Sequence, residues 1–321
     1  MPESSESVEG RRLPGEPSGD DRGQGGRGSC RHGEGGPGAD QPVSFIGDLR
    51  LRRHFERLMM ATHWDESFPV IRLNGAGARD FLQGQTTADL RQTQPGVLQQ
   101  SCWLTATGRL RAVLELRLDG DGADVMVLAG DADAMAQGLD QVIFPADRVR
   151  IGERRLQRRV QALDADSPSA WISSEGTLPA ELVSSLPLPA SAFEQKRVRL
   201  GFPPGPAELT GNTNPFELGL AKFISLDKGC YLGQETMAKL AARGGIKQQL
   251  RCWLSSQPLR SGELLLDGET RAGVVTSSLA LRNDSFAGLA LIRRQYLSSE
   301  QLSGPGGEVL TMERPELFQD P

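Results

Sequence analysis

The sequence has no long apolar run. No stretch approaches the roughly 20 consecutive apolar residues that a membrane-spanning helix needs, and the first residues lack the apolar core of a signal peptide. Glu and Asp are frequent in the same N-terminal segment, which argues against an organellar transit peptide. We therefore expect a cytoplasmic protein without a membrane segment.

Paired cysteines are also lacking. The four cysteines are Cys30, Cys102, Cys230 and Cys252; they form no C-x-x-C pair and are too scattered for a disulfide framework. Cys102 and Cys252 each precede a Trp inside an apolar run, so we expect both to be small buried hydrophobic side chains. Cys30 and His32 share the N-terminal tail, but two ligands are too few for a metal site, and no metal is predicted.

The chain has no excess of positive charge and few aromatic residues. The formal net charge of the 321 residues is -5, and aromatic residues make up 5%. Binding to nucleic acid needs a basic surface for the phosphates and rings for the bases, so no direct nucleic-acid partner is expected, although a local basic patch stays open. Nothing in the chain demands a second copy, and we expect a monomer.

The composition changes along the chain predict three regions and an α+β fold. Residues 1–41 are rich in Gly, Pro and Ser and have almost nothing apolar to bury, which predicts a disordered tail. Residues 42–245 mix helix and strand patterns. Residues 246–321 contain short strands separated by turns, which predicts a C-terminal β-barrel whose polar end, after residue 303, frays.

Several elements of the middle region can be predicted individually from apolar periodicity and turn residues. Helices are expected at 48–60, at 78–82 and, capped by Asp131, at 131–143. Strands are expected at 68–73, at 125–128, at 148–151, at 160–163 and as a pair within 101–118 that breaks at Thr107-Gly108.

The densest chemical pattern is Asp227-Lys228-Gly229-Cys230-Tyr231-Leu232-Gly233-Gln234-Glu235. Gly229 lets backbone or ligand approach the thiol of Cys230 closely, and the cation of Lys228 two residues away would favour the thiolate. Gly233 precedes a helical pattern that continues through Ala242. The spacing alone leaves two interpretations open, namely a reactive thiol and a buried cysteine in a turn.

The eight residues Lys228–Glu235 match K-G-C-Y-x-G-Q-E, the signature of the YgfZ family, whose eukaryotic relatives include the mitochondrial iron–sulfur assembly factor IBA57. The chain resembles this family, in the right order, over about residues 66 to 296. The other matching segments are FLQGQTTAD at 81–89, Gly108-Arg109, NPFELGL at 214–220, Arg243-Gly244 and LALIRR at 289–294. The resemblance implies that Cys230 and Lys228 are the functional pair, within a site shaped by the signature residues Gly229, Tyr231, Gly233, Gln234, Glu235, Arg243 and Gly244.

This family is similar to the T-protein of the glycine cleavage system, an aminomethyltransferase that uses tetrahydrofolate. The resemblance implies a cloverleaf of three domains with tetrahydrofolate, or a derivative, in a central hole. Glu208, Asn214 and Glu217 fall in the stretch that contacts folate in that superfamily. A carboxylate suits a pterin because its two oxygens can accept two parallel N–H bonds.

The implied function is that of a tetrahydrofolate-binding protein in iron–sulfur cluster assembly or repair, with an indirect effect on tRNA modification by cluster-dependent enzymes. Ordinary clusters take four protein ligands, so Cys230 would share a transient cluster with a partner or react with a thiol or one-carbon species. Both possibilities stay open. The implied partners are folate and iron–sulfur assembly or client proteins.

Three enzymatic alternatives compete with this interpretation. The aminomethyltransferases carry a catalytic Asp soon after the strand pair that here includes Gly108 to Glu115. No Asp stands there, although Glu115 is close, so transferase turnover stays open as the alternative function. A cysteine hydrolase needs a histidine base, and the histidines (His32, His54 and His63) are all far upstream. A direct tRNA enzyme is disfavoured by the acidic balance.

Overall fold

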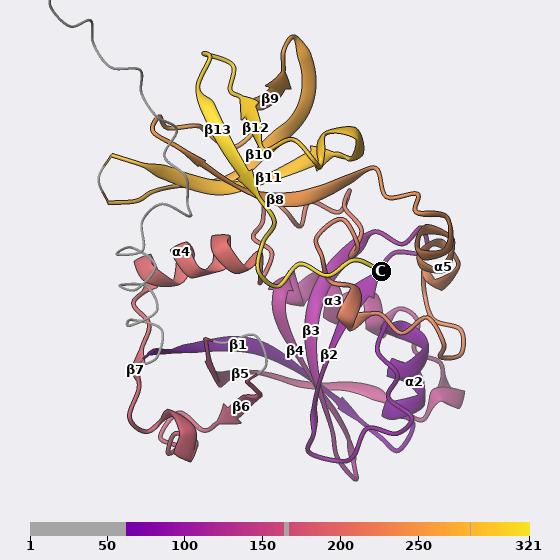
Figure 1. Cartoon of the computed structure of the whole chain (residues 1–321). Coiled ribbons are helices and arrows are strands. Elements are labelled where there is room, and N and C mark those ends of the chain that lie inside the picture. The colour runs from indigo at the N-terminus through magenta and orange to yellow at the C-terminus, as the bar shows by residue number, and fades with distance from the viewer. Residues whose placement is uncertain (1–61, 164–166, 283) are drawn as a thin grey trace, which may run out of the picture. The chain divides into compact units, whose positions relative to one another are not determined.

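The computed structural model describes residues 62–163, 167–282 and 284–321. The predicted tail at 1–41 and the predicted helix at 48–60 therefore lie outside the described residues. From residue 62 onward the chain forms a mixed sheet with helices, a largely irregular segment and a barrel, as Figure 1 shows. The predicted α+β class is confirmed.

The sheet has seven strands in the order β2-β3-β4-β1-β5-β6, and β7 pairs in parallel with β1 at the start of that strand. Strands β2 to β4 form a meander, because tight turns at Thr107-Gly108 and Asp119–Gly122 reverse the chain between them. The strands are β1 (Thr62–Asn74), β2 (Leu98–Leu104), β3 (Leu110–Leu118), β4 (Gly122–Gly130), β5 (Arg150–Ala162), β6 (Ser169–Ile172) and β7 (Leu186–Pro187).

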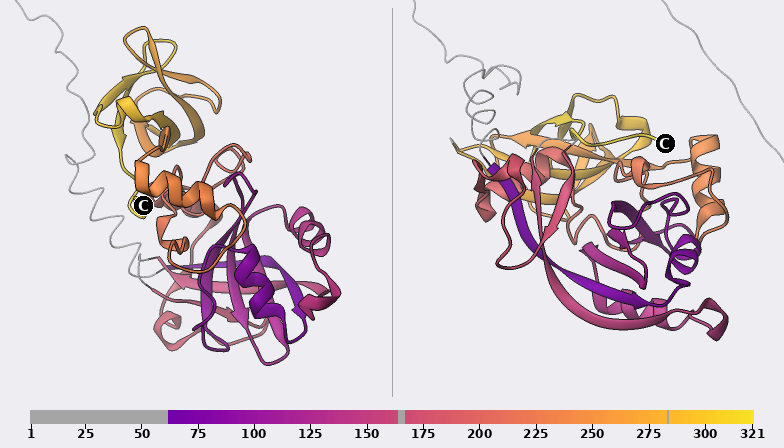
Figure 2. Two further views of the ribbon diagram at one scale, coloured as in Figure 1. Left: turned by 90° about the vertical axis from the view of Figure 1, so that its right-hand side faces the viewer. Right: turned by 90° about the horizontal axis from the view of Figure 1, so that it is seen from below.

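Strand β5 corrects one prediction. The sequence suggested two separate strands at 148–151 and 160–163, because the intervening residues are mostly Arg, Glu and Gln. They instead form one strand that pairs with β1 from His63↔Ala162 to Asn74↔Arg150, and Figure 2 shows the two strands as a long curved pair. The charged side chains fit because acidic residues of neighbouring elements, including Asp65 and Asp124, pair with arginines of β5.

Two helices cover one face of the sheet, α2 (Ala78–Gln85) and α3 (Ala132–Asp140). Asp131 caps α3 as predicted, since its Oδ1 accepts from the backbone N–H groups of Asp133 and Ala134 at 2.9 and 3.0 Å. Apolar side chains of both helices, including Leu82 and Met135, form one buried core with strand residues such as Leu114. The core on this face fixes α2 and the turn that follows it.

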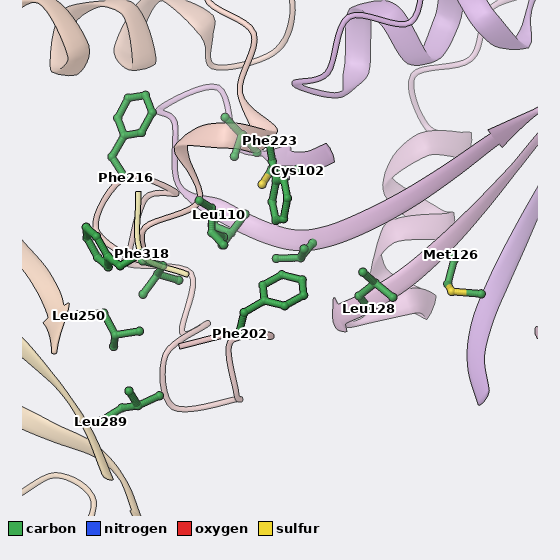
Figure 3. Packing of buried hydrophobic residues seen from close by; sticks show 14 of the residues in the cluster. Cys102, Leu110, Met126, Leu128, Phe202, Phe216, Phe223, Leu250, Leu289 and Phe318 are labelled. Atoms are coloured by element: carbon green, nitrogen blue, oxygen red, sulfur yellow. The ribbon is translucent and has the colours of Figure 1, made fainter. Parts of the chain in front are cut away.

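The other face of the sheet contributes to a second core that reaches the barrel. It includes α4 (Ala190–Leu200) and the mostly irregular segment that follows, which contains the short 3-10 turn η3 (Ala221–Phe223) and leads to α5 (Gln234–Arg243). Figure 3 shows side chains of this core from the sheet, from the irregular segment and from the barrel. Its labelled members are Cys102, Leu110, Met126, Leu128, Phe202, Phe216, Phe223, Leu250, Leu289 and Phe318.

The predicted C-terminal β-barrel is confirmed. Six strands close on themselves in the order β10-β11-β8-β13-β12-β9 around a third core that includes Trp253 and Leu310. They are β8 (Gln248–Ser255), β9 (Leu264–Asp267), β10 (Thr270–Ala280), β11 (Phe286–Arg293), β12 (Gln301–Ser303) and β13 (Val309–Glu313).

The predicted fraying after residue 303 is wrong. Strand β13 closes the barrel against β8, and the last residues run back over the segment before α5. Phe318 is buried against Gly219, where a Cβ would lie 2.5 Å from its ring, and the N–H of Gln319 donates to the carbonyl of Gly219 at 3.0 Å. The composition suggested a loose end because one buried aromatic ring among polar residues leaves no periodic pattern.

Candidate functional site

The loop that carries Cys230 lies between η3 and α5, and the thiol of Cys230 is exposed and free. Gly233 ends the loop with φ at +85°, a conformation that favours glycine. A Cβ there would lie 2.7 Å from the carbonyl oxygen of Thr105, so only glycine lets the loop pack on the β2–β3 turn. Of the two interpretations left open by spacing, the buried cysteine is excluded.

Lys228 has a structural role that the sequence did not predict. Its side chain is buried, and its ammonium donates to three backbone carbonyls, those of Gln83, Thr86 and Ala88, at 2.7, 2.6 and 2.7 Å. Burial lowers the pKa of Lys228 to about 8. Because all three donors are used, the lysine anchors the loop to the end of α2 and has no N–H left for a direct bond to the thiol.

The cation that does lie against the loop is Arg91, from the segment between α2 and β2. A Cβ on Gly229 would lie 2.5 Å from a guanidinium nitrogen of Arg91, so the absence of a side chain at 229 admits this arginine. Sequence reasoning missed Arg91 because it stands 138 to 139 positions before Gly229 and Cys230 and follows the family segment that ends at Asp89. Only the fold brings the two segments together.

Three further signature residues lie in the thiol loop or at the start of α5: Tyr231, Gln234 and Glu235. The Tyr231 ring is buried 4.9 Å from the ammonium of Lys228, its hydroxyl has no partner among the described residues, and burial raises its pKa to about 12. Gln234 donates to the carbonyl of Lys228 at 3.0 Å. Glu235 is exposed and pairs with Lys239, which lowers the pKa of its carboxyl group.

Arg243 and Gly244 lie at the other end of α5. Arg243 is exposed in the last turn, and Gly244 has φ at +58° and ends the helix. The carbonyl of Gly244 accepts from the guanidinium of Arg294 after β11. The Arg-Gly pair that resembles the family pattern thus ends the helix that begins after the thiol loop.

The three predicted folate contacts are buried, and the structure shows what each carboxylate holds. Glu208 accepts from the N–H of Gly205 at 2.7 Å, from Arg197 at 3.2 Å and from Ser277 at 2.6 Å, so both of its oxygens have partners. Glu217 and Asn214 bond to each other reciprocally, side chain to backbone, at 3.0 and 3.1 Å. Burial raises the pKa of Glu217.

A cavity of about 690 Å³ opens elsewhere, between the sheet, α4 and η3. None of the three predicted folate contacts is among its lining residues. Its aromatic lining includes Trp64 and Phe193, whose rings stack 5.0 Å apart. The other aromatic lining residues are Trp171, Phe202 and Phe223, and the polar ones include Gln99, Gln100, Gln161, Arg117, Lys196 and Lys222. Sequence reasoning missed this set, because its members are spread over more than 150 positions and follow no spacing rule.

Glu115 lies on the wall of this cavity, fully buried, and is held by four donors. Arg159 binds both of its oxygens at 3.0 Å, Ser169 donates at 2.7 Å and the indole of Trp171 donates at 2.6 Å. Because each of its two oxygens accepts two of these bonds, the carboxylate has no lone pair directed at a substrate proton. Glu115 therefore does not replace the missing catalytic Asp.

Of the histidines considered as a base for the thiol, His63 lies within the described residues, and its ring faces other side chains. His63 is buried at the start of β1, where Nδ1 lies 2.7 Å from the Ser185 hydroxyl and Nε2 lies 3.6 Å from the Asp65 carboxylate. His32 and His54 fall outside the described part of the chain. No group of three or more His, Cys, Asp or Glu residues that could hold a metal ion occurs within the described ranges.

The two other described cysteines are less exposed than Cys230. Cys102 is fully buried in β2, as predicted, and burial raises the pKa of its thiol. Cys252 is only partly buried, and its thiol donates to the carbonyl of Val198 at 3.1 Å. Within the described residues, no helix is both long and apolar enough to cross a membrane.

The fold of this chain is that of the glycine cleavage T-protein. The aminomethyltransferase T of the glycine cleavage system from Bartonella henselae superposes with a TM-score of 0.64 over 84% of this chain and 89% of that one, at 18% identity. At that identity the likeness establishes the fold alone. No family model matches the sequence.

Relatives of known name define the family more closely. The tRNA-modifying protein YgfZ of Colwellia psychrerythraea is 32% identical over 237 residues, which cover 62% of this chain and 73% of the relative. A mitochondrial homologue of the iron–sulfur cluster assembly factor IBA57 from Chaetomium globosum is 26% identical over 310 residues, 78% of this chain and 70% of that protein. The chain belongs to the YgfZ family and is also similar to the IBA57 homologue.

Proposed function

We propose that this protein binds a tetrahydrofolate in the 690 Å³ cavity and uses the thiol of Cys230 in iron–sulfur cluster assembly or repair, with tRNA modification affected through cluster-dependent enzymes. The observation that carries the proposal is the pairing of an aromatic-walled cavity with an exposed, anchored thiol in a chain of this family. The printed names of the two relatives support the cellular role, one for cluster assembly and one for tRNA modification.

The cavity suits the chemistry of a folate. Flat aromatic walls match a pterin and an aminobenzoyl ring, and the side-chain amides of Gln99, Gln100 and Gln161 offer donors and acceptors for the pterin edge. Folate ends in a glutamate with two carboxylates. Lys196 and Lys222 line the same cavity and would complement these carboxylates.

The thiol is suited to a transient task shared with another protein. Cys230 is exposed, and the described residues supply no set of further ligands around it. An ordinary cluster needs four protein ligands, so a cluster held here would take the others from a partner. The transferase alternative is not favoured, since the carboxylate nearest to the expected catalytic position, Glu115, is fully engaged.

The test is an anaerobic calorimetric titration of the full chain with tetrahydrofolate. We expect saturable one-to-one binding that Phe193→Ala weakens about tenfold, because this change removes a stacked ring from the cavity wall. Phe286→Ala, which removes a half-buried ring of the barrel, is the matched control and should leave the affinity unchanged.

Two further variants separate the cavity from the contacts implied by the family resemblance. If Glu208→Gln or Glu217→Gln weakens binding while Phe193→Ala does not, the folate lies at those residues and not in the cavity. Absence of any binding by the wild-type protein would overturn the proposed folate site and leave only the thiol function to be tested.

A further inference from the structure

A second pocket, of about 730 Å³, lies at one end of the barrel and collects positive charge. Five of its lining residues are cations: Arg109, Lys247, Arg271, Arg293 and Arg294. All five are exposed. We refer to this pocket, with these five residues, as the cationic basin.

Strand pairing explains why the cations meet. Arg271 stands near the start of β10 and Arg293 at the end of β11, which are paired beside each other, while Arg293 faces Gln248 at the start of β8. The N–H of Arg294 donates to the carbonyl of Lys247 at 2.9 Å. Four cations thus come from one edge of the barrel, and Arg109 comes from the β2–β3 turn of the sheet.

These charges are only partly balanced within the described residues. None of the five forms an ion pair there; Arg109 donates to the carbonyl of Asn212 at 2.6 Å, and Arg293 donates to that of Arg271 at 3.3 Å. The one carboxylate among the described lining residues is Glu217, which is only 3% exposed and accepts from the backbone N–H of Asn214. Its charge interacts with those of Arg109 and Lys247, so one negative charge faces five positive ones. Elsewhere on the described chain, arginines such as Arg72, Arg117 and Arg155 are paired with carboxylates.

We propose that the cationic basin binds a compact ligand that carries at least two anionic groups, carboxylate or phosphate. Four of the five cations are arginines, whose guanidinium forks match both groups with paired N–H bonds. All five line one pocket, and the screening length in physiological salt is about 8 Å, so a ligand with several anionic groups gains most from their combined charge.

The lining also indicates what the ligand is not. Among the residues that the structure describes, no aromatic ring lines the basin, so these residues offer no platform on which bases would stack. The chain as a whole carries a net charge of -5, which repels a long polyanion beyond the basin itself. A small polyanionic molecule or a short acidic peptide segment therefore fits better than a nucleic acid.

The basin is connected to both ends of α5. Arg294 donates to the carbonyl of Gly244 at the C-terminal end of the helix, and the turn of Arg109 packs against its first half, since a Cβ on Gly108 would lie 2.9 Å from the Thr236 side chain. The thiol loop directly precedes this helix. A ligand in the basin would thus bind beside the element that supports Cys230, whether or not the protein binds a folate.

The test titrates the full chain separately with inorganic pyrophosphate and with a triglutamate peptide, in about 50 mM salt so that screening stays weak. We expect at least one probe to bind saturably and the affinity to fall as salt is raised. The double variant Arg271→Gln/Arg293→Gln should weaken that binding about tenfold or more, because two charge-assisted contacts are lost. Binding of pyrophosphate alone identifies phosphate as the group recognised, and binding of the peptide alone identifies carboxylate.

The matched control is Arg260→Gln/Arg282→Gln, which removes two exposed arginines of the barrel outside the basin. It should change the affinity less than about twofold. Melting curves of both double variants check that the barrel is intact. The proposal is overturned if neither probe binds, or if both double variants bind the probe as well as the wild type does.

Discussion

Lys228 belongs to the signature, but its structural role cannot be predicted from its neighbours in the sequence. Its ammonium donates to carbonyls that lie 145, 142 and 140 positions earlier in the chain. Two of these, Gln83 and Thr86, belong to or directly follow α2, where carbonyls lack partners within the helix. The lysine is thus a tether between two segments, and the exposed thiol depends on it for its position.

Replacing this tether should cost stability. Lys228→Met keeps the length of the side chain but leaves three carbonyls without a donor, so we expect a loss of about 3 kcal/mol in the free energy of unfolding. Urea denaturation monitored by tryptophan fluorescence measures it. Lys239→Met, on the exposed face of α5, is the control and should change stability by less than about 0.5 kcal/mol. Equal stability of both variants would show that water replaces the tether at no cost.

The thiol itself should matter for function and not for stability. Cys230 is exposed, so Cys230→Ala should leave the melting temperature nearly unchanged while abolishing the support of a cluster-dependent reporter enzyme in cells. Cys252→Ala, which removes a partly buried thiol, is the control and should keep that support. Normal reporter activity with Cys230→Ala would exclude a role for the thiol.

How far these residues could be predicted depends on whether their partners are near in sequence. The turn at Cys230, the glycine at 233 and the helix after it follow from local pattern, and all are found, whereas the exposure of the thiol was left open by the sequence. The roles of Lys228 and Arg91 do not, because each depends on a contact between segments about 140 residues apart. Glu115 shows the same limit, since Arg159 and Trp171 come from strands that only the fold brings beside it.

At the scale of elements, charged side chains connect four consecutive strands of the sheet, β3, β4, β1 and β5. Asp124 of β4 is nearly buried and lies 2.7 Å from Arg117 of β3 and 2.8 Å from Arg155 of β5, with Arg72 of β1 at 3.6 Å. Burial alone would raise the pKa of Asp124, but the hydrogen bonds from Arg155 and Arg117 outweigh it and the pKa is lowered. The ionised carboxylate therefore stabilises the folded sheet.

This arrangement predicts a pH dependence. Since the folded pKa lies below the unfolded value of 3.8, the unfolded chain takes up the proton first as the pH falls, and the stabilisation present above about pH 4 is lost in acid. Asp124→Asn should cost about 2 kcal/mol at pH 7, and the difference from wild type should shrink below pH 4. Denaturation curves across this range test it. Asp133→Asn, which alters the exposed pair with Arg154, is the control; a pH-independent difference for Asp124→Asn would contradict the prediction.

At the scale of the whole described molecule, one core includes both the sheet and the barrel. It contains Cys102 and Met126 of the sheet, Phe216 of the intervening segment, and Leu250 and Leu289 of the barrel (Figure 3). The last residues add Phe318 to the same core. Because the barrel shares these apolar contacts with the sheet, unfolding the barrel alone would expose part of the common core to water.

We therefore expect a single cooperative thermal transition for residues 62–321. Leu250→Ala should lower that one transition, since Leu250 is fully buried in the shared core and its truncation costs about 3 kcal/mol. Leu264→Ala, at a 42% exposed position of β9, is the control and should change it little. Calorimetry that resolves two transitions, with only one shifted by Leu250→Ala, would show that the barrel is independent.

The tether at Lys228 also has a consequence for the order in which the chain becomes native. The thiol loop is fastened to α2 and the residues after it, through Lys228, through the N–H of Leu232 on Gly84 and through that of Ser225 on Thr87. Those acceptors leave the ribosome long before Cys230 does. A C-terminal fragment made alone would contain Cys230 but not the residues that hold its loop in place. The thiol would therefore reach its native position only after the segment around α2 has folded.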